Sequence, residues 1–131
     1  MAAGNYNFTI EQGSTFKRTF KYKDSNGDPI ELKNHDVRMD IRPNIDSSTT
    51  ILEVREVGSD NTSPTQTGFT VTSASLDAIA NEINLTIDAD TTASMSFDKA
   101  VYDIEIADNS TTKVVTRILQ GKIKLSKEVT R

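Results

Sequence analysis

The amino-acid sequence predicts an all-β sandwich, and three observations support that prediction. Short segments of alternating apolar and polar residues recur along the 131 residues, and a period of two is typical of strands with one buried face. Turn residues separate these segments at spacings of about 8–12 residues, which favours a sandwich or barrel. Strand-like segments never alternate with long helical ones, as a doubly wound fold requires. We therefore expect about seven or eight strands, with one or two short helical turns, in a single domain over residues 1–131.

The first half of the chain contains several strand-like segments separated by turns. Residues 14–23 alternate over the longest stretch of this half. The Asn26-Gly27 pair predicts a hairpin turn within residues 24–29, because both residue types tolerate positive φ. Expected extended segments in this half are residues 6–10, 14–23, 30–32, 37–42 and 51–57, with polar loops over residues 44–50 and 58–67.

The second half continues the pattern and ends in a hairpin. Residues 100–107 alternate, a polar turn covers residues 108–112, and one long strand from Val115 runs nearly to the C-terminus. An isolated hairpin is only marginally stable in water, so a second sheet must cover its apolar face. Further strands are expected over residues 68–72 and 83–87, and short helical turns over residues 73–80 and 89–95, the second capped by Asp88 or Asp90.

Two residues of this hairpin make the predicted fold more specific. Tyr102 lies at the start of a late strand, where immunoglobulin-like sandwiches often have a tyrosine that bonds back to the preceding corner. An ordinary half-buried strand tyrosine is the favoured interpretation, and the alternative is that its hydroxyl bonds to a carbonyl around Ser96 to Asp98. Gly121 interrupts the last strand, which indicates a bulge or a close backbone approach. The predicted fold is therefore an immunoglobulin-like antiparallel β-sandwich.

Composition excludes several classes of function. The net charge of −4 argues against binding nucleic acid through its phosphates and, more weakly, against an anionic membrane surface. The chain has no cysteine, so disulfides, thiol catalysis and cysteine-based zinc sites are excluded. Residues 1–7 lack the features of a secretory signal, and no apolar run is long enough to span a membrane. We expect synthesis in a bacterial or viral cytoplasmic setting, without secretion.

Two groups of residues resemble reactive or ligand-binding sites. Asp24, Asn26 and Asp28 have the spacing of the first half of a calcium loop. The glutamate expected at the twelfth position is replaced by His35, so a hairpin turn is the favoured interpretation. His35 is the only histidine, and a surface position is favoured because no organised neighbours accompany it. We therefore assign no catalytic, cofactor-binding or metal-binding residue and expect no enzyme activity and no cofactor.

The basic residues fall on two of the expected strands. Such charges usually keep a strand edge soluble and unpaired, and a complementary contact with another subunit is the alternative. These residues are Lys17, Arg18 and Lys21 on an early strand, and Lys113, Arg117, Lys122, Lys124 and Lys127 on or beside the last one.

Several segments resemble small structural proteins of tailed bacteriophages, including phages of cyanobacteria. The segments are residues 6–16, 23–32, 37–42, 101–106, 115–123 and 126–131, and the resemblance is weakest over residues 44–80. It lies in turns and strands, so it transfers no site residues. In such phages, similar β-sandwich modules occur in baseplates and at the bases of receptor-binding proteins.

The resemblance implies a non-enzymatic structural protein of a virion, made in the cytoplasm of the bacterial host. A tail or baseplate component, or a fibre adaptor, is the favoured role, with a capsid decoration or neck protein as the alternative. Its partners would be other virion proteins, and several copies per particle are expected. Carbohydrate- and cell-surface-binding modules often use exposed aromatic side chains on one face. Such a module is less favoured here because the chain has only three tyrosines, five phenylalanines and no tryptophan.

Overall fold

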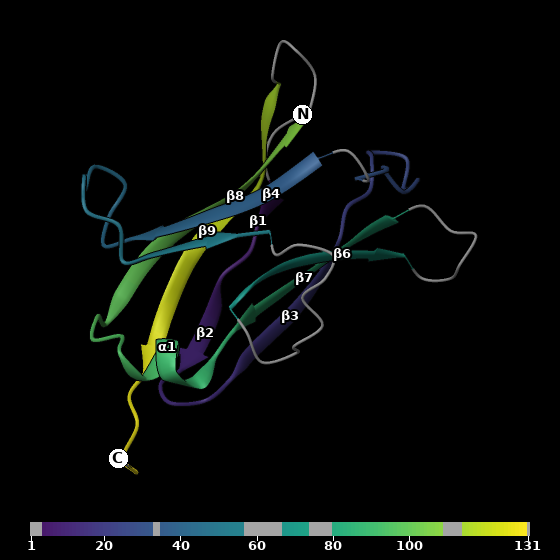
Figure 1. Cartoon of the computed structure of the whole chain (residues 1–131). Helices are drawn as coiled ribbons and strands as arrows, with labels where there is room; N and C mark the ends of the chain where they lie inside the picture. Colours follow the sequence, from purple (N-terminus) through teal and green to yellow (C-terminus); the bar gives the residue numbers. More distant parts are fainter. Residues whose placement is uncertain (1–3, 33–34, 57–66, 74–79, 109–113, 131) are drawn as a thin grey trace.

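The computed structural model describes residues 4–32, 35–56, 67–73, 80–108 and 114–130. Two β-sheets pack face to face in this part of the chain, and one short helix lies at the end of the sandwich where β2 and β9 finish (Figure 1). The elements are β1 (Gly4–Asn5), β2 (Phe8–Glu11), β3 (Phe16–Lys21), β4 (His35–Arg42), β5 (Leu52–Arg55), β6 (Gly68–Ser73), β7 (Ala80–Ile87), α1 (Ala89–Ala93), β8 (Lys99–Asp108) and β9 (Val115–Ser126).

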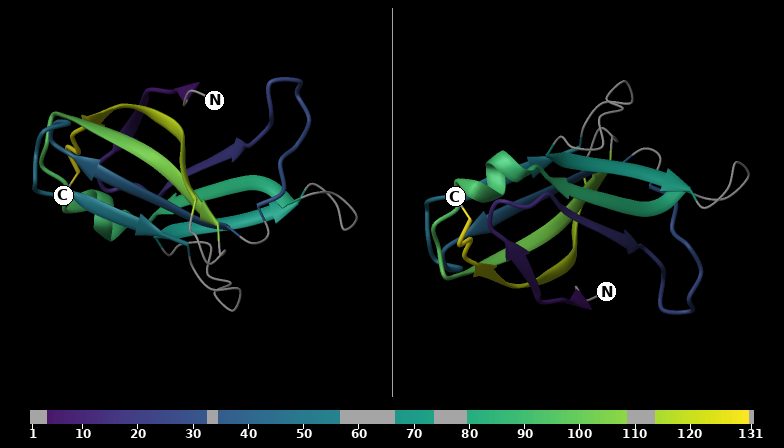
Figure 2. Two further views of the ribbon diagram at one scale, coloured as in Figure 1. Left: turned by 90° about the horizontal axis from the view of Figure 1, so that it is seen from above. Right: turned by 90° about the horizontal axis from the view of Figure 1, so that it is seen from below.

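The strand order confirms the predicted sandwich. The larger sheet has the order β9-β8-β4-β5, with β1 and β2 both pairing with the free side of β9, and the smaller sheet has the order β3-β7-β6. The two layers face each other when the molecule is seen from above and below (Figure 2). The chain therefore crosses from one sheet to the other after β2, β3, β5 and β7, in the arrangement of immunoglobulin-like sandwiches.

The N-terminal segment departs from the expected antiparallel pairing. The strand predicted over residues 6–10 begins only at Phe8, as β2, and a separate short strand, β1, precedes it, with Tyr6 and Asn7 between the two. Both strands run parallel to β9, with Gly4 opposite Leu119 and Phe8 opposite Ile123. Among the described residues this raises the number of strands to nine, while the other pairings between named strands are antiparallel.

The core lies between the two sheets and follows the predicted alternation. Buried and partly exposed residues alternate strictly along β7, and the inward residues of β4 and β8 are almost completely buried. The largest fully buried side chains come from both sheets and from Leu32, which precedes β4; those of the sheets include Phe69, Ile10, Met39, Ile41, Ile83, Leu85, Ile87, Ile104 and Ile123.

Most expected elements occur, with two differences. Residues 30–32 form no strand, although Leu32 is buried and its N–H donates to the Ala80 carbonyl at 2.9 Å. The helical turn expected over residues 73–80 does not form at its ends, because Ser73 finishes β6 and Ala80 begins β7. Its middle, the turn at 109–112 and most of the loop at 58–67 lie outside the described residues.

The predicted helical turn after β7 is confirmed as α1, and Asp88 is its N-cap. The Asp88 carboxylate accepts hydrogen bonds from the Thr91 N–H at 2.7 Å and from the Thr67 hydroxyl at 2.9 Å. The first of these contacts is the main reason that the pKa of Asp88 lies below its ordinary value of 3.8. The cap therefore joins α1 to the residue that precedes β6.

Replacing Asp88 with alanine is expected to lower the free energy of unfolding by about 1 kcal/mol near neutral pH, the usual cost of a lost N-cap. The pKa of Asp88 is lower in the folded state than its ordinary value of 3.8 in the unfolded chain. The charge-dependent part of this stabilisation is therefore complete above pH 3.8, and it is lost as the pH falls through the lower pKa of the folded state. Urea unfolding across this range should show the difference from wild type shrinking. The Asp88→Asn control keeps a capping side chain without a titratable group, so its stability should lack this pH dependence; equal pH profiles for Asp88→Asn and wild type would contradict the assignment.

Tyr102 and Gly121 form the contact that ties the N-terminal segment to the larger sheet. The alternative bond of Tyr102 to residues 96–98 does not form: its hydroxyl donates to the Tyr6 carbonyl at 2.6 Å. Tyr102 is paired with Gly121 across β8 and β9, and a Cβ atom at Gly121 would overlap the Tyr6 carbonyl oxygen. The close backbone approach predicted at Gly121 is thus confirmed. The bulge of β9 lies elsewhere, at Ile118, which faces no β8 residue in the register.

Candidate interaction surface

The outer face of the larger sheet carries a dense set of charged side chains. Strands that bury apolar residues on one side present alternate residues to the solvent on the other. The register places Arg38 opposite Glu105 and Asp40 opposite Asp103, while β5 and β9 add charges on either side. The charged residues of this face include Asp36, Arg38, Asp40, Arg42, Glu53, Arg55, Lys99, Asp103, Glu105, Arg117, Lys122 and Lys124.

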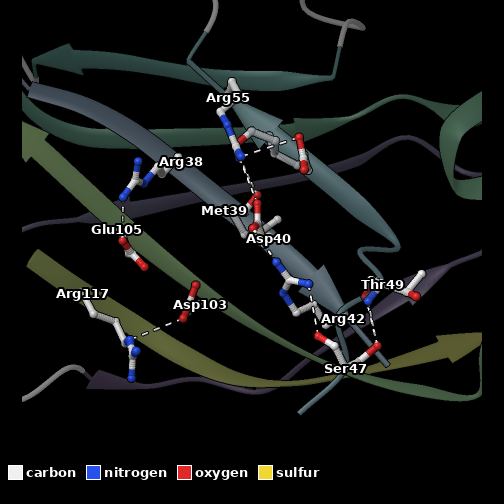
Figure 3. Close-up of polar contacts among 12 residues, drawn as sticks. Arg38, Met39, Asp40, Arg42, Ser47, Thr49, Arg55, Asp103, Glu105 and Arg117 are labelled. Atoms are coloured by element: carbon white, nitrogen blue, oxygen red, sulfur yellow. Dashed lines mark hydrogen bonds and ion pairs between the residues drawn. The ribbon is translucent and has the colours of Figure 1, made fainter. Parts of the chain in front are cut away.

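The four arginines of this face all form ion pairs, which we call the arginine network (Figure 3). Arg38 contacts Glu105 at 3.1 Å, and Arg117 contacts Asp103 at 3.3 Å. Asp40 is shared by Arg55 at 3.0 Å and Arg42 at 3.4 Å. These side chains are partly exposed, so each pair contributes only about 0–1 kcal/mol to stability.

The arginine network offsets repulsion between neighbouring carboxylates. Asp103 lies directly opposite Asp40 and on the same face as Glu105. Burial raises the pKa of Asp103, the charge of Glu105 raises it further, and the Arg117 guanidinium acts in the opposite direction. A hollow of about 470 Å³ lies over these residues, and its lining includes Ile45, an apolar side chain that is 83% exposed. This part of the face is therefore internally neutralised and combines ion pairs with an exposed apolar group.

Three lysines on the same face form no ion pair with any residue that the structure describes. Lys99 lies directly opposite Lys124 across β8 and β9, and Lys122 is two residues from Lys124 on the same side of β9. Lys99, Lys122 and Lys124 line a hollow of about 290 Å³, and within the described ranges none of them forms an ion pair. We call these residues the lysine cluster. Like charges directly opposite each other destabilise a sheet.

The turn at residues 24–29 forms the predicted hairpin connection. Asp24 accepts hydrogen bonds from the N–H groups of Asn26 at 2.9 Å and Asp28 at 3.0 Å through one carboxylate oxygen. The Gly27 N–H donates to the Asp24 carbonyl at 3.0 Å, and Gly27 adopts the positive φ of 85° that the Asn-Gly pair predicted. The residues of the supposed half calcium loop therefore stabilise the turn itself. Within the part of the chain that is described, no group of three or more metal-ligating side chains is arranged to hold an ion.

His35 is half-buried at the start of β4, and the predicted surface position is wrong in that respect. Its backbone N–H donates to the Leu32 carbonyl at 3.1 Å. Its Nδ1 atom is buried and has no hydrogen-bond partner among the described residues. The register pairs it with Asp108 at the end of β8. No described residue completes a catalytic arrangement around the ring.

Sequence reasoning identified Lys122 and Lys124 but missed Lys99. Alternation placed the first two on one face of the last strand, whereas Lys99 stands just before the segment predicted as a strand. The missing information was the register of β8 against β9, which pairs Lys99 with Lys124. Continuing the antiparallel pairing of the predicted hairpin outward from its turn could have placed Lys99 close to Lys124. Lys113, the remaining basic residue predicted near the last strand, lies outside the described ranges.

Comparisons with known proteins add no identification. Neither the protein-family models nor the curated proteins contain a match to this chain. In the described part of the chain, no helix is long and apolar enough to cross a membrane. The surface chemistry and the resemblance described above are therefore the basis for a functional proposal.

Proposed function

We propose that this protein is a non-enzymatic structural component of a tailed-phage virion, acting in the tail or baseplate or as a fibre adaptor through protein–protein assembly. Two lines of support combine here. The turn and strand segments of the sequence resemble small phage structural proteins, and the β-sandwich is a fold that such proteins use. The outer face of the larger sheet provides a surface that could contact a neighbouring subunit.

The lysine cluster is the observation that carries the proposal. On one sheet face the four arginines are neutralised by carboxylates of the same chain, while Lys99, Lys122 and Lys124 are left without ion pairs in the described residues. The chain has 19 acidic residues and only 15 lysines and arginines, so this positive group stands out against an acidic molecule. Carboxylates on a neighbouring virion protein would supply the charge that the cluster lacks. Complementary charges of this kind mainly set specificity and register at an interface.

The double variant Lys99→Gln with Lys124→Gln separates assembly from folding. It removes the directly opposed like charges, so the free energy of unfolding should stay the same or rise. Incorporation into virus particles should nevertheless fall by about tenfold, corresponding to about 1.4 kcal/mol of lost binding. Quantitative mass spectrometry of purified particles measures the incorporation.

A control with the same change in charge is Lys23→Gln with Lys127→Gln, because Lys23 follows β3 and Lys127 lies past the end of β9, where it pairs with Asp98 at 2.9 Å and not with the lysine cluster. This control should be incorporated at the wild-type level. Equal incorporation of the two double variants would contradict the proposed role of the lysine cluster. A cluster variant that is both less stable and poorly incorporated would show that these lysines serve the fold instead.

A further inference from the structure

In the described part of the chain, the outer edge of β3 is a free strand edge. β3 is the terminal strand of the smaller sheet and pairs only with β7 among the described residues. The N–H of Tyr22, the residue after β3, donates to the carbonyl of Asn81 in β7 at 2.9 Å. Because backbone groups alternate in direction along an antiparallel pair, the N–H and C=O groups of Lys17, Thr19 and Lys21 point away from β7. No other described residue forms a hydrogen bond with these backbone groups.

An apolar slot of about 300 Å³ runs beside this free edge. One wall is formed by residues 19–22, and the opposite wall comes from the larger sheet, with Ile118 and Leu119 of β9. Ile83 and Ile104, each only 1% exposed, also line the slot. The N-terminal segment pairs with β9 instead of β3. The slot therefore lies between the sheets at the edge that this segment leaves unpaired.

The edge itself is strongly basic. Lys17, Arg18 and Lys21 stand within six residues of β3, and none of them has an ion pair in the described part of the chain. The Arg18 guanidinium lies over the Phe16 ring at 5.1 Å. Antiparallel pairing of two β3 strands about Thr19 would place Lys17 of one copy opposite Lys21 of the other, which is unfavourable. The charges thus oppose pairing with a second copy of β3 and favour an acidic strand.

We infer that the free edge of β3 binds an extended acidic segment of a partner protein as an added strand. The outward backbone groups of Lys17, Thr19 and Lys21 would form its main-chain hydrogen bonds. Apolar side chains at alternate positions would enter the slot, and the acidic side chains between them would contact the basic residues. Main-chain bonding combined with pockets for alternate side chains is a known mode of peptide recognition. This inference does not depend on the virion proposal, because it concerns a different sheet and a different group of lysines.

Binding is tested with fluorescent peptides of roughly ten residues in which valine alternates with glutamate or with lysine. The full chain should bind the valine–glutamate peptide at least about tenfold more tightly than the valine–lysine peptide. Hydrogen exchange measured by NMR should slow at the amides of Lys17, Thr19 and Lys21 when the acidic peptide is bound. Unchanged exchange at these amides, or equal affinity for the two peptides, would overturn the inference.

Two variants identify the edge as the binding site. Thr19→Pro removes an outward N–H, and edge strands tolerate proline at such positions, so affinity for the acidic peptide should fall at least about tenfold while the circular dichroism spectrum is retained. Lys17→Glu with Lys21→Glu should reverse the preference in favour of the valine–lysine peptide, and this variant remains decisive if the proline variant fails to fold. Lys99→Glu with Lys122→Glu, on the other sheet, should leave the preference unchanged. Wild-type affinity in the folded proline variant, or an unreversed preference in the Lys17 and Lys21 variant, would contradict β3 as the site.

Discussion

Replacing Phe8 with alanine is expected to lower the free energy of unfolding by about 4 kcal/mol, the typical cost of removing a buried phenylalanine ring. Phe8 is 7% exposed. Its ring centroid lies 5.0 Å from that of Phe16 and 4.9 Å from that of Tyr102. Phe16 belongs to the smaller sheet and Tyr102 to the larger one, so the Phe8 ring joins the N-terminal segment to both layers. Its loss should open a cavity where the two sheets meet.

Chemical denaturation followed by circular dichroism measures this loss. Phe8→Leu is the matched control, because leucine keeps most of the buried apolar volume and should cost clearly less than alanine. Truncation at Phe8 should also speed hydrogen exchange in β2, since this strand has only four residues to hold it against β9. If the free energy of unfolding of Phe8→Ala lay within about 1 kcal/mol of the wild-type value, the ring would not join the two layers in this way.

Replacing Gly121 with alanine should lower the free energy of unfolding by about 3 kcal/mol, at the upper end of the usual cost of overpacking. The added Cβ atom would overlap the Tyr6 carbonyl oxygen, which belongs to backbone and cannot move aside as a flexible side chain can. Displacing this backbone would also break the hydrogen bond from the Tyr102 hydroxyl to the Tyr6 carbonyl. The bond at 2.9 Å from the Lys122 N–H to the Asn7 side chain would be lost with it.

Gly4→Ala is the matched control for this substitution. Gly4 belongs to β1 and lies opposite Leu119 of β9, the strand that contains Gly121. An added Cβ atom at Gly4 would lie 3.4 Å from the nearest atom, a terminal carbon of Leu119. The free energy of unfolding of the Gly4→Ala variant should lie within about 0.5 kcal/mol of the wild-type value. Neither glycine has a positive φ, so the comparison isolates the steric overlap. Similar unfolding midpoints for the two variants would contradict the close approach at Gly121.

Elements defined by local alternation could be predicted from the sequence. The pattern of residues 100–107 predicted a half-buried strand, and β8 has nearly the same bounds and the expected alternation of burial. The aspartate before residues 89–95 predicted the capped turn that α1 forms. These features depend on residues close together in the chain, so periodicity and capping preferences are sufficient to find them.

Contacts between distant segments could not be predicted in the same way. A period of two does not specify whether a neighbouring strand is parallel or antiparallel, so the parallel pairing of β1 and β2 with β9 was missed. Tyr102 and Tyr6 are 96 residues apart, and their bond depends on the missing side chain at Gly121. The alternative of a local corner at Tyr102 therefore does not hold, whereas Gly121 correctly indicated a close approach.

The candidate surface was predicted only in part for the same reason. Alternation placed Lys122 and Lys124 on the outside of the last strand, and both are exposed. Their relation to Lys99, and the pairing of every arginine on that face, depend on the register among four strands. The difference between a neutralised arginine network and an unpaired lysine cluster is thus a property of the folded sheet.

The position of this protein within a virus particle tests the proposed assembly role most directly. Antibodies raised against the purified chain can be coupled to gold and imaged by electron microscopy on particles released from the host that carries the gene. The proposal predicts gold label on the tail or baseplate, at several positions per particle because such parts are symmetric. Label confined to the capsid would contradict the tail placement, and absence of the protein from purified particles would contradict a virion role altogether.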